Sequence, residues 1–196
     1  PPEGRARFTA PAWTPLAEPR DARYPMALNT GRLRDQWHGM SRTGQLGRLF
    51  AHTPEPALQL HPQELQRRGW AEGALVRVQS RRGSLVLPVQ ASDSLAPAQA
   101  FIAMHWGEEF VSGISPSGER LAGVNALTSG VFCPDAKQPE FKHTPIKILK
   151  AEMPWNLLAI AWLPDSQQHQ ARQTLQTLMA EFDFAPQPPH QAQDDT

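Results

Sequence analysis

Proline is the residue type that most constrains what this chain can fold into. The sequence holds 20 prolines among 196 residues, about twice the usual share. Because proline lacks a backbone N–H and clashes with the preceding helical turn, this density favours turns, short strands and loops over long helices. Six of the prolines fall within residues 1–25. We therefore predict an extended lead-in over residues 1–23, with Phe8, Trp13 and the adjoining Tyr24 available to dock.

Charge, cysteine content and hydropathy exclude several classes of protein. Lys+Arg and Asp+Glu number 19 each, which argues against a general nucleic-acid binder. A single cysteine excludes a disulfide framework and a four-cysteine zinc or iron–sulfur site. The longest apolar run, Leu157–Leu163, is too short to cross a bilayer. The sequence starts at Pro1 without a signal-peptide pattern, so we expect a piece of a longer protein.

Short apolar and alternating runs between residues 24 and 150 predict strands joined by turns. The expected strands cover residues 26–28, 57–61, 75–79, 84–89, 100–104 and 145–149. The segment 61–69 predicts one short helix, because Pro62 suits its first turn and Gly69 its C-terminal end. We expect a turn at 29–31 and an exposed loop at 108–123. The pattern is mainly β and favours a small barrel of mixed topology.

The composition changes near Glu152, which predicts a strand–helix extension over residues 153–185. The run from Trp155 to Leu163 is apolar enough for a buried strand, and Asp165 or Ser166 can cap a following helix. Apolar residues then recur at helical spacing on one face: Ala171, Leu175, Leu178, Met179 and Phe182. The Pro/Gln/Asp-rich tail at 186–196 is predicted to be disordered.

Residues 30–44, called here the 30–44 loop, carry the strongest chemical signal. They contain three arginines and one acidic residue in a chain of zero net charge. Arginines grip phosphate with paired donors, and hydroxyls and backbone N–H groups add to such a site. The glycines at 31, 39 and 44 allow the backbone to come close to a ligand or to adopt positive φ. A phosphate-binding loop and a solvated basic loop around a core Trp37 remain equal alternatives, because no P-loop or GxGxxG pattern is present.

Other candidate residues are weaker on composition alone. His105 and Trp106 follow an apolar strand, where they can line a pocket or, as composition favours, plug a barrel end. Asn125 can read a purine edge and Lys142 can place a charge near a phosphate, although an ordinary capped turn explains both. Cys133 has no neighbouring base or second ligand. We assign no catalytic residue and no metal ligand to this chain.

Four segments, taken in order, resemble a known family. They are YPMALNTGRLRDQWHGMSRTG (24–44), LHPQELQRRGWAEGALVRVQSRRGSLVLPVQAS (60–92), AMHWG (103–107) and VNALTSGVFCPDAKQPEFKHTPIKI (124–148). Over roughly residues 4–152 the chain resembles the C-terminal molybdopterin-dinucleotide-binding domain of the dimethyl sulfoxide reductase superfamily, most strongly that of bacterial assimilatory nitrate reductases. The pair of motifs LNTGRxRDQWHxMSRTG and AKQPEFK is specific, whereas either alone is weaker.

The resemblance implies a fold and a cofactor. The fold is a six-stranded double-psi β-barrel over residues 24–152, with a few short helices and the C-terminal strand–helix extension. The barrel is implied to close over a molybdenum-bearing bis-molybdopterin guanine dinucleotide, which it shares with larger upstream domains of the same polypeptide. A 4Fe–4S cluster and the molybdenum ligand are implied to lie in that upstream part, so the chain alone is expected to be inactive. Nucleic-acid and membrane partners are not expected, and the implied location is cytoplasmic.

The resemblance also implies roles for individual residues. The implied cofactor contacts are Thr30, Gly31, Arg32, Trp37, His38, Met40, Ser41, Arg42, Thr43, Asn125, Phe141 and Lys142. Trp106 is implied to lie near a substrate funnel. Gly39 departs from the threonine that is common at its position, and the loop at 108–123 is longer than in periplasmic nitrate reductases.

The implied reaction is the two-electron reduction of nitrate to nitrite. Two alternatives stay open on the sequence. One is the same domain in a formate dehydrogenase or another oxidoreductase of the superfamily. The other is a non-enzymatic barrel that binds phosphate ligands or a protein. The fold cannot decide the substrate, because one fold supports many reactions.

Overall fold

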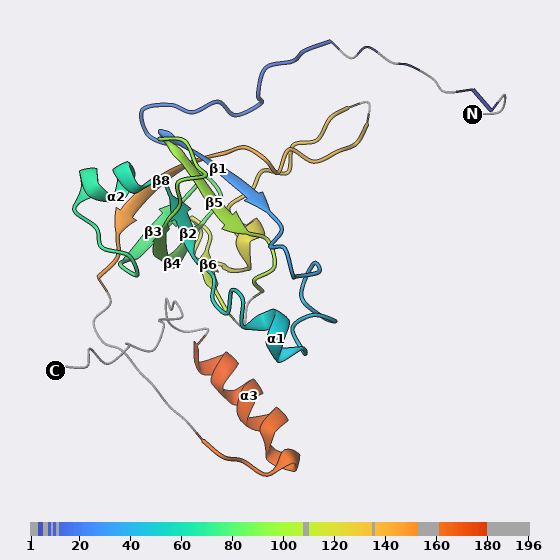
Figure 1. Cartoon of the computed structure of the whole chain (residues 1–196), viewed down its shortest axis with the longest axis vertical. Helices are drawn as coiled ribbons and strands as arrows, with labels where there is room; N and C mark the ends of the chain where they lie inside the picture. The colour runs from blue at the N-terminus through green and yellow to red at the C-terminus, as the bar shows by residue number, and fades with distance from the viewer. Residues whose placement is uncertain are drawn as a thin grey trace.

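The computed structural model describes residues 4–5, 8, 10, 12–107, 110–134, 136–152 and 161–179. Its strands are β1 (Met26–Gly31), β2 (Leu58–Leu60), β3 (Leu75–Gln79), β4 (Ser84–Ala91), β5 (Gln99–Ala103), β6 (Ser112–Ile114), β7 (Arg120–Ala122) and β8 (Thr144–Lys150). Its helices are α1 (Gly47–Phe50), α2 (Pro62–Arg68), the 3₁₀ helix η1 (Val124–Ala126) and α3 (Asp165–Met179). The strands gather in the upper part of the molecule and α3 lies apart below them (Figure 1).

Six of the strands form a closed barrel. The sheet runs in the order β2-β5-β1-β8-β3-β4-β6-β7, and a further pairing of β2 with β4 joins the ends of its first six strands. The β1–β5 and β2–β4 pairs are parallel, whereas the other pairs in the ring are antiparallel. The predicted mainly β, six-stranded barrel is therefore confirmed, and its mixed pairing fits a double-psi topology.

The barrel core follows from alternation along the strands. Because successive side chains point to opposite faces, every second residue of a strand can enter the interior. The side chains of Leu58 and Leu60 on β2, and of Val76 and Val78 on β3, are fully buried in this way. Burying a leucine or valine side chain contributes about 1.5–3 kcal/mol, so these short strands are stabilised mainly by their shared interior.

The short helix and the hairpin were predicted from local signals, and the structure confirms both. Helix α2 begins after His61, whose Nδ1 accepts a hydrogen bond from the Gln63 N–H at 3.1 Å. It ends at Gly69, which adopts φ 65° in the left-handed region that glycine tolerates best. Strands β3 and β4 pair in antiparallel register across the loop at 80–83.

Two sequence expectations were wrong. Strand β1 does not end in a turn at 29–31, because Asn29–Gly31 continue in parallel register against Phe101–Ala103 of β5. The segment 108–123 is not simply an exposed loop. Its strands β6 and β7 form a hairpin that pairs with the start of β4. In both cases pairing with a distant strand overrides the local turn and loop composition.

The lead-in docks through its final residues. Arg81 Nη2 lies 2.6 Å from Asp21 Oδ2, and the Arg81 guanidinium stacks over the Tyr24 ring at 5.0 Å. Tyr24 is only 5% exposed, whereas Phe8 and Trp13 are 96% and 86% exposed. Among the three aromatic residues expected to dock, Tyr24 alone does so.

Helix α3 confirms the predicted helix, but it begins at Asp165, so Asp165 and Ser166 lie in its first turn and not at the cap position before it. Its Leu175 and Leu178 side chains are more than half exposed, and the helix lies away from the barrel (Figure 1). Most of the strand expected at 155–163, together with Phe182 and the tail at 186–196, lies outside the described residues. Within the described ranges no helix is long and apolar enough to span a membrane.

Candidate functional site

The end of strand β1 brings together residues from both predicted cofactor segments. Thr30 Oγ1 donates a hydrogen bond to the Phe141 carbonyl at 3.1 Å, and Lys142 Nζ donates to the Thr30 carbonyl. These partners are 111 and 112 positions apart in the sequence. Gly31 follows directly, so the fold places Thr30, Gly31, Phe141 and Lys142 in one cluster.

Close approach explains two of the three glycines in the 30–44 loop. A Cβ on Gly31 would lie 2.8 Å from Phe101 Cε2, and one on Gly44 would lie 2.8 Å from the Met40 carbonyl oxygen. A Cβ on Gly39 would meet nothing within 4 Å. Close approach of these glycines to a ligand stays a prediction, and the alternative of positive φ is wrong, because none of the three adopts it.

The positive φ angles of the 30–44 loop occur at residues other than its glycines. His38 has φ 42° and Met40 has φ 61°, a region that costs a residue with a Cβ free energy unless its surroundings hold it. The Met40 N–H donates to the Trp37 carbonyl and the Met40 carbonyl accepts from the Gly44 N–H, both at 2.8 Å. Two tight turns therefore fold the loop back on itself.

Thr43 and Met40 shape the loop from inside. Thr43 Oγ1 donates to Gln36 Oε1 at 2.6 Å and accepts from the Trp37 N–H at 3.2 Å. Gln36 Nε2 in turn donates to the Leu49 carbonyl of α1 at 3.3 Å. The Met40 side chain is buried in the core. These two predicted contact residues therefore have structural partners in the chain itself.

The outer face of the loop is exposed, cationic and aromatic. The exposed predicted residues here are Arg32, Trp37, His38, Ser41 and Arg42. The Arg32 guanidinium lies 5.6 Å from the centre of the Trp37 ring, and Trp37 meets His38 edge to face at 4.6 Å. Trp37 is 49% exposed, so the alternative of a solvated loop around a core tryptophan does not describe it. The face can receive a large ligand with negative charge and flat rings.

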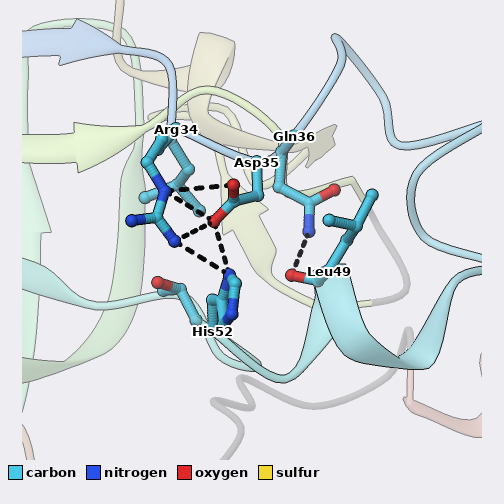
Figure 2. Close-up of a pocket in the computed structure, with 7 residues that line it drawn as sticks. Arg34, Asp35, Gln36, Leu49 and His52 are labelled. Carbon is cyan, nitrogen blue, oxygen red and sulfur yellow. Dashed lines mark hydrogen bonds and ion pairs between the residues drawn. The ribbon is translucent and has the colours of Figure 1, made fainter.

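A second cluster lies beside this face. Figure 2 shows Arg34, Asp35 and His52 turned toward one another, each side chain in contact with the other two. Arg34 Nη2 and His52 Nδ1 lie 2.9 Å and 2.5 Å from Asp35 Oδ2. They border a pocket of about 320 Å³ lined by Leu33, Arg34, Asp35, Gln36, Leu49, His52 and Thr53.

The Asp35 carboxylate neutralises one of the three arginines in the loop. The hydrogen bonds from Arg34 and then from His52 lower the pKa of Asp35 from 3.8 to about 2. Asp35 is therefore ionised at neutral pH and forms an ion pair with Arg34. Within the described residues, this leaves Arg32 and Arg42 as the loop cations without an ion pair to an acidic side chain. Sequence reasoning missed this cluster, because His52 follows Asp35 by 17 positions and only the turn around α1 brings them together.

His105 is a further residue that the sequence did not assign to the site. It follows β5, its side chain is 2% exposed, and both ring nitrogens contact the backbone of the 30–44 loop. The sequence placed it at a strand end, but only the fold shows which backbone groups it reaches.

The remaining predicted residues stand on separate segments. Asn125 lies on η1 and is exposed. Trp106 is buried in the core, edge to face with Phe110 at 5.0 Å, so its place near a substrate funnel stays a prediction. Cys133 is exposed. Over the described ranges, no group of three or more His, Cys, Asp or Glu side chains could hold a metal ion.

The chain is similar to known proteins in sequence. Residues 26–145 match the family described as Molydopterin dinucleotide binding domain. The sequence is 39% identical over 146 residues to a nitrate reductase of Klebsiella oxytoca, which covers 74% of this chain and 16% of the relative. Nitrate reductases of Synechocystis sp. and Shewanella frigidimarina are 38% and 31% identical, over 74% and 76% of this chain and 19% and 17% of their own lengths.

The fold is also similar to that of a solved structure. Acetylene hydratase from Pelobacter acetylenicus superposes with a TM-score of 0.52 and 22% sequence identity, over 65% of this chain and 18% of that one. At this identity the likeness concerns the fold. The chain spans between 16% and 19% of the length of the three nitrate reductases it matches.

Proposed function

Because the chain belongs to the Molydopterin dinucleotide binding domain family, we propose that it binds the dinucleotide part of a bis-molybdopterin guanine dinucleotide. The observation that carries this proposal is the cluster at the end of β1. There the 30–44 loop meets Phe141 and Lys142 through hydrogen bonds to Thr30. The cluster holds the 30–44 loop against the barrel. The cationic and aromatic outer face of the loop stays exposed.

The residues present fit such a cofactor. A pyrophosphate requires cationic and hydroxyl donors, which Arg32, Ser41 and Arg42 supply on the exposed face of the loop. The ammonium of Lys142 adds a positive charge beside Gly31, where the missing Cβ makes room for the Phe101 ring. Asn125 offers both a donor and an acceptor for the edge of a guanine or pterin ring. Arg34 is not among the proposed ligands, because Asp35 already binds it.

The cofactor, when bound, supplies two-electron redox and oxygen-transfer chemistry at its molybdenum. The residues of this chain bind and orient it and exclude water, which is the usual part of a protein in cofactor catalysis. Arg32 and Arg42 would hold charge in place, and Thr30, Thr43 and Met40 keep the loop in shape. We assign no proton transfer to this chain.

We propose further that the whole protein is a nitrate reductase that converts nitrate to nitrite. The identity of 31% to 39% with three nitrate reductases supports this reading. In that protein the upstream domains of the same polypeptide would share the cofactor and carry the molybdenum ligand and a 4Fe–4S cluster. Assimilation of nitrate in the cytoplasm is the setting that we propose for it.

The test uses the full-length protein that contains this chain, purified from a host that makes the cofactor. Bound molybdenum and released guanine nucleotide are measured, and nitrite formation is assayed with a chemically reduced viologen dye. Molybdenum together with nitrite formation would support the whole proposal. Molybdenum without nitrite would keep the cofactor assignment and overturn nitrate as the substrate, with formate tested next. A protein without molybdenum or nucleotide would overturn the proposal.

A further inference from the structure

We propose that His105 is a positioning residue that fixes the shape of the 30–44 loop before the cofactor binds. This inference rests on the proposed function, because it treats the loop as a cofactor site. It goes further by assigning a role to a buried side chain outside the loop. The geometry that carries it is a pair of hydrogen bonds from one imidazole ring to two points of the loop backbone.

The two hydrogen bonds determine how the ring is protonated. His105 Nε2 lies 2.9 Å from the backbone nitrogen of Leu33, and Nδ1 lies 2.5 Å from the carbonyl oxygen of His38. The Leu33 N–H can only donate, so Nε2 must be the acceptor. Nδ1 therefore carries the ring proton and donates it to His38. This is the neutral Nδ1–H tautomer, and each ring nitrogen has one partner.

The two partners stand at informative places in the loop. Leu33 follows Arg32, the exposed arginine that we propose as a cofactor ligand, and His38 is the first residue of the 30–44 loop with positive φ. Strained backbone persists where the surroundings hold it, and the hydrogen bond to the His38 carbonyl acts at that point. His105 thus fixes both ends of the segment from Leu33 to His38, which includes the Arg34–Asp35 pair and Trp37.

The alternative that His105 only fills space at the barrel end does not explain its hydrogen bonds. A plug needs only volume and an apolar surface, which a phenylalanine would supply equally well. The ring of His105 is 2% exposed, yet both of its polar atoms face backbone groups of one loop. Burying two polar atoms is costly unless both are hydrogen-bonded. Both ring nitrogens of His105 find their partners in the 30–44 loop. The buried ring is therefore fully hydrogen-bonded only while the loop keeps this conformation.

The consequence is a site that is largely formed before its ligand arrives. A preorganised loop loses less conformational entropy when it binds, which strengthens binding without an added contact. Removing His105 should therefore weaken cofactor retention although the side chain is not among the proposed ligands. It should also loosen the loop when no cofactor is present.

Three substitutions separate the two hydrogen bonds. His105→Gln places an acceptor near the position of Nε2 and keeps the partner of Leu33. His105→Asn places a donor near Nδ1 and keeps the partner of His38. His105→Phe keeps the ring volume and removes both bonds. Val76→Ala in β3 is the control, because Val76 is fully buried in the barrel core and belongs to neither the loop nor its contacts.

The first readout is limited trypsin digestion of the full-length protein made in a host that lacks the cofactor. Cleavage after Arg32, Arg34 and Arg42 reports the loop, and cleavage after Arg67 on α2 is the internal reference. We expect His105→Phe to speed cleavage in the loop by about 30-fold, the effect of losing two ordinary hydrogen bonds. The glutamine and asparagine variants should lie in between. Val76→Ala should leave loop cleavage slow at an equal loss of thermal stability.

The second readout is molybdenum retained by the same variants in a cofactor-competent host, where the phenylalanine variant should retain least. Unchanged loop cleavage in all three variants, or an equal increase in Val76→Ala, would overturn the proposal. If His105→Phe does not fold, the glutamine and asparagine variants still decide it. A wild-type protein that binds no molybdenum would refute the proposed function, whereas loop cleavage in the cofactor-free protein would still test His105.

Discussion

A single carboxylate changes the charge that the 30–44 loop offers to a ligand. Counted from the sequence, the loop has three arginines, and each is an equal candidate to bind phosphate. In the structure Arg34 donates from Nε and from Nη2 to the carboxylate of Asp35, at 3.0 Å and 2.9 Å, which makes a bidentate pair. The charges left for a ligand are therefore those of Arg32 and Arg42, with Lys142 arriving from the other segment.

The depressed pKa of Asp35 predicts a dependence of stability on pH. Its folded-state pKa of about 2 lies below the usual 3.8, so its ionised form stabilises the fold fully above pH ~4. This contribution is lost as the pH falls from ~4 toward ~2. Asp35→Asn should therefore be less stable than the wild type at pH 7, and the difference should shrink as the pH falls through that range.

Urea unfolding at a series of pH values checks this prediction. Asp93→Asn is the matched control, because Asp93 is an exposed aspartate outside the loop. A gap for Asp35→Asn that stays constant down to the acid limit of folding would show that the charge of Asp35 contributes nothing.

The glycines of the loop give a second prediction for single residues. A Cβ at position 44 would press on the Met40 carbonyl oxygen, which belongs to the backbone and cannot rotate away. Gly44→Ala should lower the free energy of unfolding by about 1–3 kcal/mol, the usual cost of overpacking. Gly39→Ala should have little effect, because its Cβ would meet nothing within 4 Å. Urea unfolding of both variants measures the difference, and equal losses would contradict the close approach of Gly44 to Met40.

Regular elements were predictable from the sequence where burial alternates along the chain. Strands β2 and β3 follow from such runs, and β4, β5 and β8 follow from short apolar runs whose burial does not alternate. Helix α2 follows from its proline start and glycine end. Strands β6 and β7 escaped prediction because they are short and lie in a segment rich in glycine and serine, and because β6 is held by pairing with β4 and β7 by pairing with β6. The loop residues of the site were predictable by resemblance to a family. Their partners were not, because the contacts of His105 and His52 join residues far apart in sequence.

At the scale of elements, the prediction concerns β2, the strand that closes the barrel. Leu58 of β2 is fully buried where β2 pairs with both β4 and β5. Leu58→Ala should lower the free energy of unfolding by about 2–5 kcal/mol, through lost burial and the cavity it leaves. Leu149→Ala on β8 is the control, since Leu149 is 47% exposed, and it should change stability by about 0.5 kcal/mol or less. Similar losses in the two variants would mean that β2 does not close the barrel.

At the scale of the whole molecule, we propose that the barrel and the C-terminal helix are separate parts. The barrel has its own continuous core, drawn from all six of its strands and the segments around η1. Helix α3 lies away from it and leaves Leu175 and Leu178 exposed (Figure 1). The proposed division near residue 152 predicts that a chain ending at Glu152 melts at the same temperature as the full chain. A clear fall in melting temperature would show that the C-terminal part supports the barrel.

The most direct test of the central claim is the cofactor content of Arg32→Ala in the full-length protein. The claim is that the exposed cations of the 30–44 loop hold the dinucleotide, and a charge-assisted hydrogen bond contributes about 1.5–3 kcal/mol. Arg67→Ala is the control, because Arg67 is exposed on α2, which lies on a different part of the barrel from α1 and the loop (Figure 1). Molybdenum and guanine nucleotide per polypeptide should fall together in Arg32→Ala and stay at the wild-type level in Arg67→Ala. Unchanged molybdenum and nucleotide in Arg32→Ala would contradict the account.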